Sequence, residues 1–224
     1  MTSIARLQAR PGHRALLITT LAVPLTGWTV HAVALHRQLA NAHRDPLTGA
    51  QRRAGFERRA QHLIDRYGDT VTVALIDLDH FKALNDGHGH EAGDRALAAT
   101  GERLARWAGS RGVVGRLGGD EFAVATRIGP GRREVRLAQL ARMLSEPVDI
   151  DGHPVDVAAS IGAATPDTLN TRDLSALLRG ADTAMYAGKH TGIPVVAGPE
   201  HANAASINGR RAGRPGTHTA ARAA

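Results

Sequence analysis

The chain has 224 residues, enough for one domain of ordinary size with extensions. It contains no cysteine, which excludes disulfides, thiolate metal sites and thiol catalysis. Residues 1–44 carry five arginines and no acid, and residues 194–224 carry a net charge of +3, so the middle of the chain, 45–193, has a net charge of −1. A nucleic-acid-binding domain is expected to have a basic folded region, and this distribution argues against that class.

Residues 15–35 contain no Asp, Glu, Lys or Arg and are long enough to span a bilayer as a helix. Three interpretations compete: a single-pass anchor, a peripheral or packed helix, and a cleaved signal peptide, which the small residues Ala32 and Ala34 would suit. Positive residues flank both ends, so charge does not fix an orientation. We favour an anchor, with a short basic segment (1–14) before it and a linker helix (36–44) after it.

The rest of the chain alternates helices with strands. A helix is expected from about 51 to 65, after the break at Asp45-Pro46, and the apolar, β-branched run 71–78 predicts a central strand. Two apolar runs joined by a glycine pair predict a hairpin over 113–126. The other expected elements are helices at about 94–107, 132–145 and 171–190, a second hairpin over 148–164, and a disordered tail over 194–224.

This order of elements predicts an α+β fold: a ferredoxin-like βαββαβ core with an antiparallel-rich sheet and flanking helices, preceded by the N-terminal hydrophobic helix. In such a sheet the first strand lies beside the hairpin. Asp77, which ends the strand 71–78, and Asp120, at the hairpin tip, are then expected to meet at one edge. Two carboxylates with Lys82 nearby would suit Mg²⁺ and a polyphosphate. Taken alone, Asp120 and Glu121 fit a solvated acidic turn.

Lysine is rare in this chain, since only Lys82 and Lys189 occur among 28 basic residues. A compact ammonium placed on a phosphate would explain why these two are not arginine, and chance is the alternative. Histidines close to Lys82 could suggest a metal site, but His88 and His90 in a glycine-rich loop fit the spacing of zinc ligands poorly.

A series of motifs over about residues 45–192 resembles the GGDEF domain of diguanylate cyclases. The matching segments are Asp45-Pro46-Leu47-Thr48-Gly49; Ile76 to Lys82; Asn85-Asp86; Gly89-His90; Gly93-Asp94; Gly115-Arg116-Leu117; Gly118-Gly119-Asp120-Glu121-Phe122; Ser160-Ile161-Gly162; Ala181-Asp182; Met185-Tyr186; and Lys189. The resemblance implies a fold of the nucleotide-cyclase and polymerase-palm type, in a domain spanning 45–193.

The family condenses two GTP into cyclic di-GMP and two pyrophosphates, with one GTP held on each of two protomers. The resemblance therefore implies a homodimeric diguanylate cyclase that depends on Mg²⁺, with Mn²⁺ as an alternative ion, and that binds no nucleic acid. A domain that uses GTP would face the cytoplasm. This favours the membrane anchor over the signal peptide and predicts a single-pass protein of the cytoplasmic membrane.

The resemblance also implies roles for the matching residues. Asp77 and Asp120, with the Leu78 carbonyl, would bind the metal, and Asp120 would accept the proton of the attacking 3′-hydroxyl. The nucleotide would be bound by Lys82 and Lys189 at the phosphates, by the main chain around His80 and Phe81, by Asn85 and Asp94 at guanine with His90 nearby, and by Gly118 and Gly119, which leave it room.

The chain also departs from the family pattern. Gly109 and Gly112 replace the Arg-x-x-Asp of the inhibitory product site, so we expect no product inhibition through that site. Ile193 stands where an arginine is usual, which removes a phosphate contact worth about 1–3 kcal/mol. The opening signature drifts at Ala50, Arg52 and Ala54. Ile193 and the drifted opening favour the alternative function, a catalytically weak GGDEF domain that binds GTP as a regulatory or interaction module.

Overall fold

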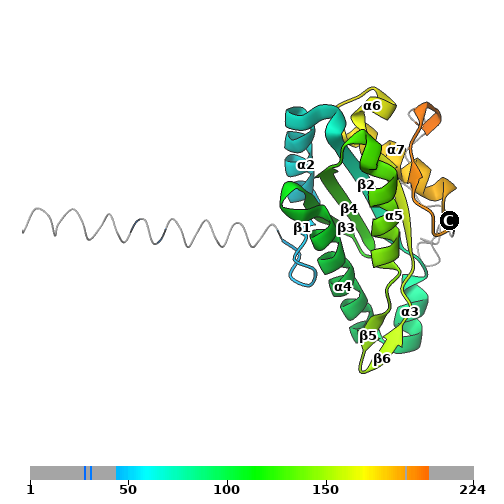
Figure 1. Ribbon diagram of the computed structural model, residues 1–224. Coiled ribbons are helices and arrows are strands. Elements are labelled where there is room, and N and C mark those ends of the chain that lie inside the picture. Colours follow the sequence, from blue (N-terminus) through cyan, green and yellow to red (C-terminus); the bar gives the residue numbers. More distant parts are fainter. Residues whose placement is uncertain (1–27, 29–30, 32–43, 190, 202–224) are drawn as a thin grey trace, which may run out of the picture. The chain divides into compact units, whose positions relative to one another are not determined.

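The computed structural model of the chain describes residues 28, 31, 44–189 and 191–201. The chain divides into two units, residues 1–43 and residues 44–224, and every element named below belongs to the second. Its centre is a sheet (Figure 1) with the strand order β1 (Gln51–Arg52), β3 (Val113–Gly118), β4 (Glu121–Arg127), β2 (Val71–Leu78), β7 (Ala159–Ala164) and β8 (Val195–Val196).

The four inner strands, β3, β4, β2 and β7, are antiparallel to one another. β2 lies between β4 and β7 and pairs with both, and β3 pairs with β4 through a tight hairpin. The short edge strands β1 and β8 run parallel to β3 and β7. This arrangement puts the C-terminal end of β2 at the same edge of the sheet as the β3–β4 turn.

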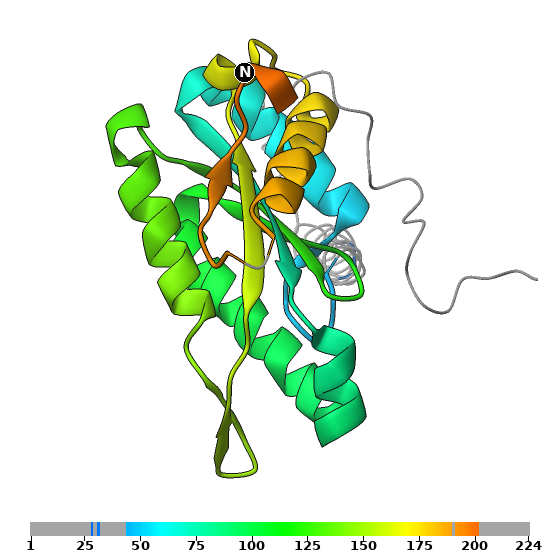
Figure 2. The ribbon, with the colours of Figure 1, turned by 90° about the vertical axis from the view of Figure 1, so that its right-hand side faces the viewer.

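Helices cover both faces of the sheet, as Figure 1 and Figure 2 show. One face carries α4 (His90–Ala108) and α5 (Arg133–Leu144), and the other carries α2 (Arg53–Tyr67) and α7 (Leu174–Ala187). The remaining elements are α3 (Phe81–His88), α6 (Pro166–Leu169), the two-stranded sheet of β5 (Val148–Ile150) and β6 (His153–Val155), and the 3₁₀ turns η1 (Gly68–Thr70), η2 (Gly109–Arg111), η3 (Pro130–Arg132) and η4 (Pro199–His201).

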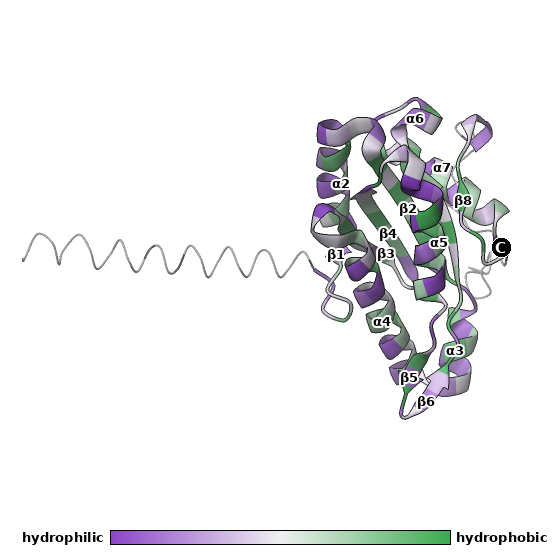
Figure 3. Ribbon diagram, in the orientation of Figure 1, coloured by the Kyte–Doolittle hydropathy of each residue, from purple (hydrophilic) through white to green (hydrophobic). Residues whose placement is uncertain are grey.

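β2 is buried along its whole length because it contacts both helical layers. Val73 and Leu75 pack toward α2 and α7, whereas Ala74 and Ile76 pack toward α4 and α5. Figure 3 shows hydrophobic residues concentrated along these inner strands. Full burial of one such large side chain stabilises the fold by roughly 1.5–3 kcal/mol. The alternation also turns the side chain of Asp77, the next residue, toward the α2 and α7 face.

The predicted mixed α+β fold, a central sheet with flanking helices, is confirmed. Several elements differ from the prediction. α3 lies where a glycine-rich loop was expected, and α4, expected from about residue 94, begins at His90. The helix expected from residue 51 begins at Arg53, because Gln51 and Arg52 pair with β3. The second hairpin turns at Asp151 and Gly152 with positive φ at both residues, but its return strand stops at Val155. The chain from Ala159 then joins the main sheet as β7.

The fold continues beyond the boundary expected at residue 193. β8 pairs with β7, and Ala197 is only 1% exposed. Residues 195–201 therefore belong to the folded domain, although the sequence predicted a disordered tail from 194. The rest of that predicted tail, residues 202–224, lies outside the described residues.

The membrane prediction requires correction. The predicted span, residues 15–35, lies outside the described residues apart from Trp28 and His31. In the part of the chain that the structure describes, no helix combines the length and the apolar character needed to cross a bilayer. This finding overturns the predicted single-pass localisation at the cytoplasmic membrane and gives no support to the membrane as a partner.

Candidate active site

The end of β2 places a buried carboxylate beside the β3–β4 turn. Asp77 is only 3% exposed and lies opposite Glu121 of β4 and Ser160 of β7 in the sheet. One residue further, the Leu78 N–H donates a hydrogen bond to the Asp120 carbonyl oxygen at 3.3 Å. The end of the strand and the hairpin turn therefore share one edge of the sheet, with Asp77, Leu78 and Asp120 in adjoining backbone positions.

Lys189 joins this edge from a distant part of the chain. Its Nζ lies 3.1 Å from Asp77 Oδ2, so the lysine supplies the cation that a buried carboxylate needs. Lys189 follows directly after α7, which packs closely on β7: a Cβ at Gly162 would overlap the Ala181 carbonyl oxygen. The close approach of α7 thus sets the position of Lys189. The sequence predicted this ammonium on a phosphate, whereas the structure places it on a carboxylate.

Two polar residues that the sequence did not assign lie in the same row as Asp77. Directly opposed residues on neighbouring strands project to the same face of a sheet, so Glu121 and Ser160 share the face of Asp77. Ser160 Oγ also donates a hydrogen bond to Asp79 Oδ1 at 2.8 Å. Taken alone, the sequence was compatible with Glu121 in a solvated acidic turn. The register, which the sequence does not contain, places it next to Asp77.

The hairpin turn is held by Arg116, a further residue without a predicted role. Its Nε and one terminal nitrogen donate hydrogen bonds to the Gly119 carbonyl oxygen at 2.9 and 2.7 Å. The other terminal nitrogen pairs with Asp45 at 3.2 Å. Gly119 has a φ of 29°, which a larger residue would adopt only with strain. We refer to Arg116, Gly119 and Asp45 together as the arginine clasp.

Asp45 is fixed from a second side by its own loop. Thr48 donates to Asp45 Oδ1 through its main-chain N–H at 2.9 Å and its hydroxyl at 2.7 Å. Partial burial would raise the pKa of Asp45, but the hydrogen bonds from Thr48 and the charge of Arg116 outweigh it and hold the pKa below its usual value. The carboxylate is therefore ionised at neutral pH, which keeps the arginine clasp charged on both sides.

α3 begins at Phe81, so only Asp79 and His80 separate it from the end of β2. His80, its N-cap, has a φ of 56°, a left-handed conformation that is rare for residues other than glycine and is often found at functional sites. The first main-chain N–H groups of a helix lack intrahelical acceptors and attract anions. Lys82 is exposed in this first turn, and Phe81 packs against the core. A pocket of about 250 Å³, lined in part by Leu78, His80 and Phe81, adjoins this turn.

The remaining predicted nucleotide-binding residues lie on α3, on α4 and in the hairpin turn. A Cβ at Gly93 would overlap Asn85 Oδ1, so the two helices meet closely at these residues. His90 and Asp94 lie in the first turns of α4, and both are exposed. Gly118 has no atom within 4 Å of the position that a Cβ would take. Open space thus adjoins the turn that carries Asp120.

The donor atoms at the sheet edge fit Mg²⁺. Asp77 and Asp120 offer carboxylate oxygens and Leu78 a carbonyl oxygen, which are the hard ligands that this ion prefers. Mg²⁺ is commonly bound by one or two carboxylates together with substrate phosphates and water. Among the described residues, no group of three or more His, Asp or Glu is placed so that it could hold a metal.

Comparison with known proteins agrees with this geometry. The model of the family "Diguanylate cyclase, GGDEF domain" matches residues 42–193, well over half of the chain. The chain belongs to the GGDEF family. The match includes the end of β2, the hairpin turn, α3, α4 and Lys189. Residues 195–201, which include β8 and η4, extend the GGDEF fold of this chain beyond the matched region.

Individual relatives support the assignment. The chain is 48% identical over 167 residues to the uncharacterized 19.3 kDa protein in the repSA 5′ region of Streptomyces ambofaciens, covering 75% of this chain and 89% of that one. It is 36% identical over 185 residues to the diguanylate cyclase DgcN of Escherichia coli, covering 80% of this chain but only 45% of DgcN. A solved structure of the GGDEF domain of PA1120 from Pseudomonas aeruginosa is 33% identical to this chain, with a TM-score of 0.64. The match covers 71% of this chain and 96% of that one.

Proposed function

We propose that this GGDEF domain is a diguanylate cyclase, which joins two GTP molecules into cyclic di-GMP and releases two pyrophosphates. One observation carries the proposal: the buried Asp77 and the turn that bears Asp120 lie at one edge of the sheet, next to the N-terminus of α3. Carboxylates beside a helix N-terminus can bind a divalent cation and the phosphates that the cation neutralises.

In the proposed reaction, the 3′-hydroxyl oxygen of one GTP attacks the α-phosphorus of the other. A new oxygen–phosphorus bond forms, the bond to the departing pyrophosphate breaks, and the hydroxyl proton moves to Asp120. Lys82 and the first N–H groups of α3 bind the phosphates and stabilise their charge. Asp77, Asp120 and the Leu78 carbonyl would hold Mg²⁺, which when bound neutralises phosphate charge and acidifies the hydroxyl.

Lys189 keeps its expected role at the phosphates in the proposal, but it begins from a contact with Asp77 that the sequence did not predict. Its ammonium pairs with Asp77 at 3.1 Å, on the carboxylate that the cation would share. We propose that Lys189 exchanges this partner for the terminal phosphate when GTP and the cation bind. Glu121, on the same face as Asp77, would add a further carboxylate close to the cation.

Guanine selection is assigned to the α3 and α4 pair. Asn85 offers both a donor and an acceptor, and Asp94 offers two acceptors for the N–H groups of guanine. His90 lies one turn before Asp94 on α4. The close contact of Asn85 with Gly93 fixes the amide against α4. A change of either polar group would therefore alter the choice of base as well as the affinity.

The reaction requires two protomers, since each GTP must present its α-phosphate to the other. The pocket of about 250 Å³ beside α3 is below the usual size of a site that encloses a drug-sized ligand. This supports an arrangement in which a second protomer completes the site.

Product inhibition through the family's Arg-x-x-Asp is not part of the proposal. Gly109 and Gly112 occupy those positions, and a Cβ at Gly112 would lie 2.8 Å from Ala108 Cβ.

The test is to incubate the purified full-length chain with GTP and Mg²⁺ and to quantify cyclic di-GMP and pyrophosphate by chromatography. Asp120→Asn keeps the shape of the side chain but removes its charge, and we expect it to lose product formation. Glu102→Gln, an exposed residue of α4, is the matched control and should retain it. Absence of product from the unchanged chain at high protein concentration would refute the cyclase proposal.

A second candidate function is a GTP-binding regulatory or interaction module with little turnover. The observation that favours it is Ile193, which is 68% exposed and apolar at a position where the family usually has arginine. GTP binding measured by calorimetry without product formation would support this alternative. Restoration of turnover by Ile193→Arg would show that the lost guanidinium is the cause.

A further inference from the structure

The connection between β2 and α3 consists of Asp79 and His80 alone. It joins the strand that carries Asp77 to the helix whose first N–H groups bind the phosphates in the proposed reaction. His80 has a φ of 56° and a ψ of 23°. A residue other than glycine keeps this left-handed conformation only where the surrounding structure imposes it. A contact close to His80 must therefore hold the connection in place.

α3 itself is held by few contacts. None of its eight residues is buried, although Phe81 and Leu84 pack partly against the core. Its close approach to α4, where Asn85 meets Gly93, fixes the helix on one side. The direction of its first turn, which carries the phosphate-binding N–H groups, then depends on the residues directly before the helix.

Asp79 is attached to the beginning of β7 by two hydrogen bonds. Its main-chain N–H donates to the Ala158 carbonyl oxygen at 2.9 Å, and its Oδ1 accepts from the Ser160 hydroxyl at 2.8 Å. The first bond extends by one residue the pairing of β2 with β7, which reaches Leu78 opposite Ala159. The second joins diagonal neighbours, whose side chains lie on the same face of an antiparallel pair.

Ser160 is suited to act as the fixed end of this contact. It is only 3% exposed and lies within β7, opposite Asp77 of β2. A hydroxyl in such a buried position needs a partner, and a carboxylate is a stronger acceptor than a neutral group. Because Ser160 opposes Asp77 and also holds Asp79, one residue of β7 sets the metal-binding carboxylate and the start of α3 relative to each other.

We propose that Ser160 is a positioning residue for the phosphates of GTP. Through Asp79, its hydroxyl holds the left-handed turn at His80 and so directs the first N–H groups of α3 toward phosphates bound beside Asp77. Ser160 acts through Asp79 and does not touch the nucleotide. This role rests on the proposed function, because it requires GTP to bind at this edge of the sheet.

The hydrogen bond of Asp79 and its negative charge have opposite effects on phosphate binding. The hydrogen bond keeps α3 in place, whereas a negative charge two residues before the helix repels the phosphates. Asp79→Asn keeps an oxygen that accepts from Ser160 but removes the charge. Asp79→Ala removes both. The comparison of these two variants therefore separates the hydrogen bond from the charge.

The test is calorimetric titration of the full-length chain with GTP in EDTA, which prevents turnover, and NMR titration with guanosine, which has no phosphate. We expect Ser160→Ala to weaken the Kd of GTP about three- to tenfold, as the loss of one hydrogen bond predicts. The Kd of guanosine should stay unchanged, because Asn85 and Asp94 bind the base. Asp79→Asn should bind GTP at least as tightly as the unchanged chain, and Asp79→Ala more weakly than Asp79→Asn.

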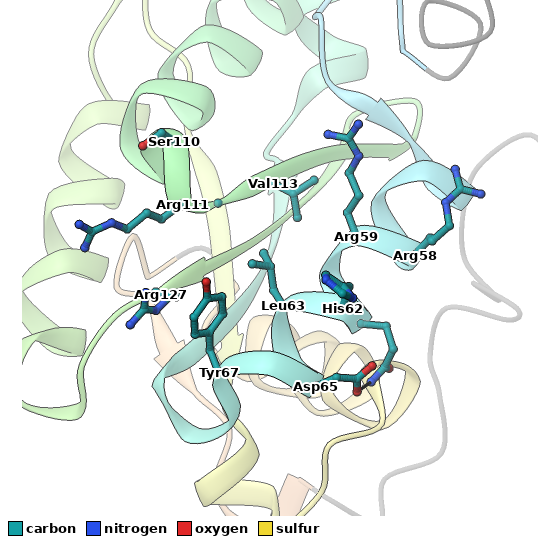
Figure 4. A pocket seen from close by; sticks show the side chains of 12 residues that line it. Arg58, Arg59, His62, Leu63, Asp65, Tyr67, Ser110, Arg111, Val113 and Arg127 are labelled. Carbon is teal, nitrogen blue, oxygen red and sulfur yellow. Dashed lines mark hydrogen bonds between the residues drawn. The ribbon is translucent and has the colours of Figure 1, made fainter. Parts of the chain in front are cut away.

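Two control variants accompany these measurements. Ser145→Ala removes a hydroxyl that donates to the Ala141 carbonyl oxygen at 2.9 Å after the end of α5, far along the chain from β7. Arg59→Ala changes a residue of a separate pocket of about 790 Å³, formed by α2, the turn before β3 and the end of β4 (Figure 4). Both controls should leave the Kd of GTP unchanged. Urea unfolding checks that every variant is folded.

Four results would overturn the role of Ser160. They are an equal Kd of GTP for Ser160→Ala and the unchanged chain, equal weakening of GTP and guanosine binding by Ser160→Ala, binding of GTP by Asp79→Asn as weak as by Asp79→Ala, and loss of GTP binding in Arg59→Ala. The last would place the nucleotide in the other pocket. An unchanged chain that binds no GTP would instead refute the proposed function itself, so the two failures are distinguishable.

Discussion

The ammonium of Lys189 and the carboxylate of Asp77 form an ion pair in which the acid is nearly buried, with 5% of its side chain exposed, and the base is partly accessible. Removal of one partner from such a pair leaves a charge in a poorly solvated place. We therefore expect Lys189→Met to lower the free energy of unfolding by about 1–3 kcal/mol. Urea unfolding followed by circular dichroism measures the change.

Asp77→Asn and the double variant complete a thermodynamic cycle for this pair. The double variant should cost less than the sum of the two single changes, because the second change removes a charge that the first has left without its partner. Strict additivity would show that the contact contributes nothing to stability. Lys189→Arg is the matched control for charge: it keeps the cation but replaces the compact ammonium by a planar group.

The carboxylate of Asp45 gives a second prediction for a single side chain, one that depends on pH. The pKa of Asp45 is lower in the folded chain than in the unfolded chain. Its contribution to stability is therefore complete above the unfolded pKa, which is about 3.9. This contribution is lost as the pH falls through the folded pKa. Asp45→Asn keeps an acceptor for Thr48 but removes the charge opposite Arg116. We expect this variant to be less stable than the unchanged chain by about 1–3 kcal/mol near pH 7.

The difference in free energy of unfolding between the unchanged chain and Asp45→Asn should become smaller below about pH 4. Urea unfolding in a series of buffers from pH 3 to pH 7 measures it. If the difference in stability were equal at pH 3 and pH 7, altered hydrogen bonds to Thr48, and not the lost charge, would be its cause. Asp149→Asn, which changes an exposed acid of β5, serves as the control substitution.

Among contacts between secondary-structure elements, the packing of α7 on β7 sets the position of Lys189 in the site. A Cβ at Gly162 would overlap the Ala181 carbonyl oxygen and lie 2.6 Å from Met185 Cβ. We expect Gly162→Ala to push α7 away from the sheet, with a loss of about 1–3 kcal/mol in stability. Because Lys189 follows α7, the rate of GTP turnover should fall as well. Thermal unfolding and the cyclase assay measure the two effects.

Gly131→Ala is the matched control for this change. Gly131 has no atom within 4 Å of a Cβ and no positive φ. The substitution should therefore leave both stability and turnover close to those of the unchanged chain. If Gly162→Ala behaved in the same way, the close contact of α7 with β7 would not be what positions Lys189.

The elements that the sequence predicted well are those whose signal is local. The apolar run from Val71 to Leu78 forms β2, which is buried on both faces. The glycine pair marks the hairpin: Gly118 ends β3, and Gly119 begins the turn to β4. The strands β1 and β8 were not predicted, since two residues each carry no periodicity. The early end of β6 and the return of the chain to the main sheet depend on pairing with β2, which no local pattern encodes.

The same distinction applies to the candidate site. The sequence predicted that Asp77 and Asp120 lie at one edge because the order of elements requires it. It could not predict the register that sets Glu121 opposite Asp77, nor the contact between Asp77 and Lys189, which are 112 residues apart. Arg116 was part of a matching motif but received no role, because its partners Asp45 and Gly119 become neighbours only in the folded chain.

The proposed reaction requires a dimer, since one GTP is bound by each of two protomers. If protomers dissociate, the specific activity must rise with protein concentration and reach a plateau when the dimer is complete. We expect the initial rate per chain to increase several-fold between nanomolar and micromolar protein at saturating GTP. The rate of pyrophosphate release measures this dependence directly. A rate per chain that stays constant over this range, with a monomer shown by sedimentation, would contradict the two-protomer reaction.

Mixing experiments separate the need for a partner from the need for a second active Asp120. The Asp120→Asn chain keeps the α3 N-terminus, Asn85 and Asp94, so it should still hold GTP in the proposed orientation. Each ring closure needs two proton transfers, one at each protomer. A mixed dimer should therefore form the first bond and release one pyrophosphate, but close the second bond slowly. Excess Asp120→Asn chain is then expected to lower cyclic di-GMP formation by the unchanged chain while a linear dinucleotide accumulates, and chromatography distinguishes the two products.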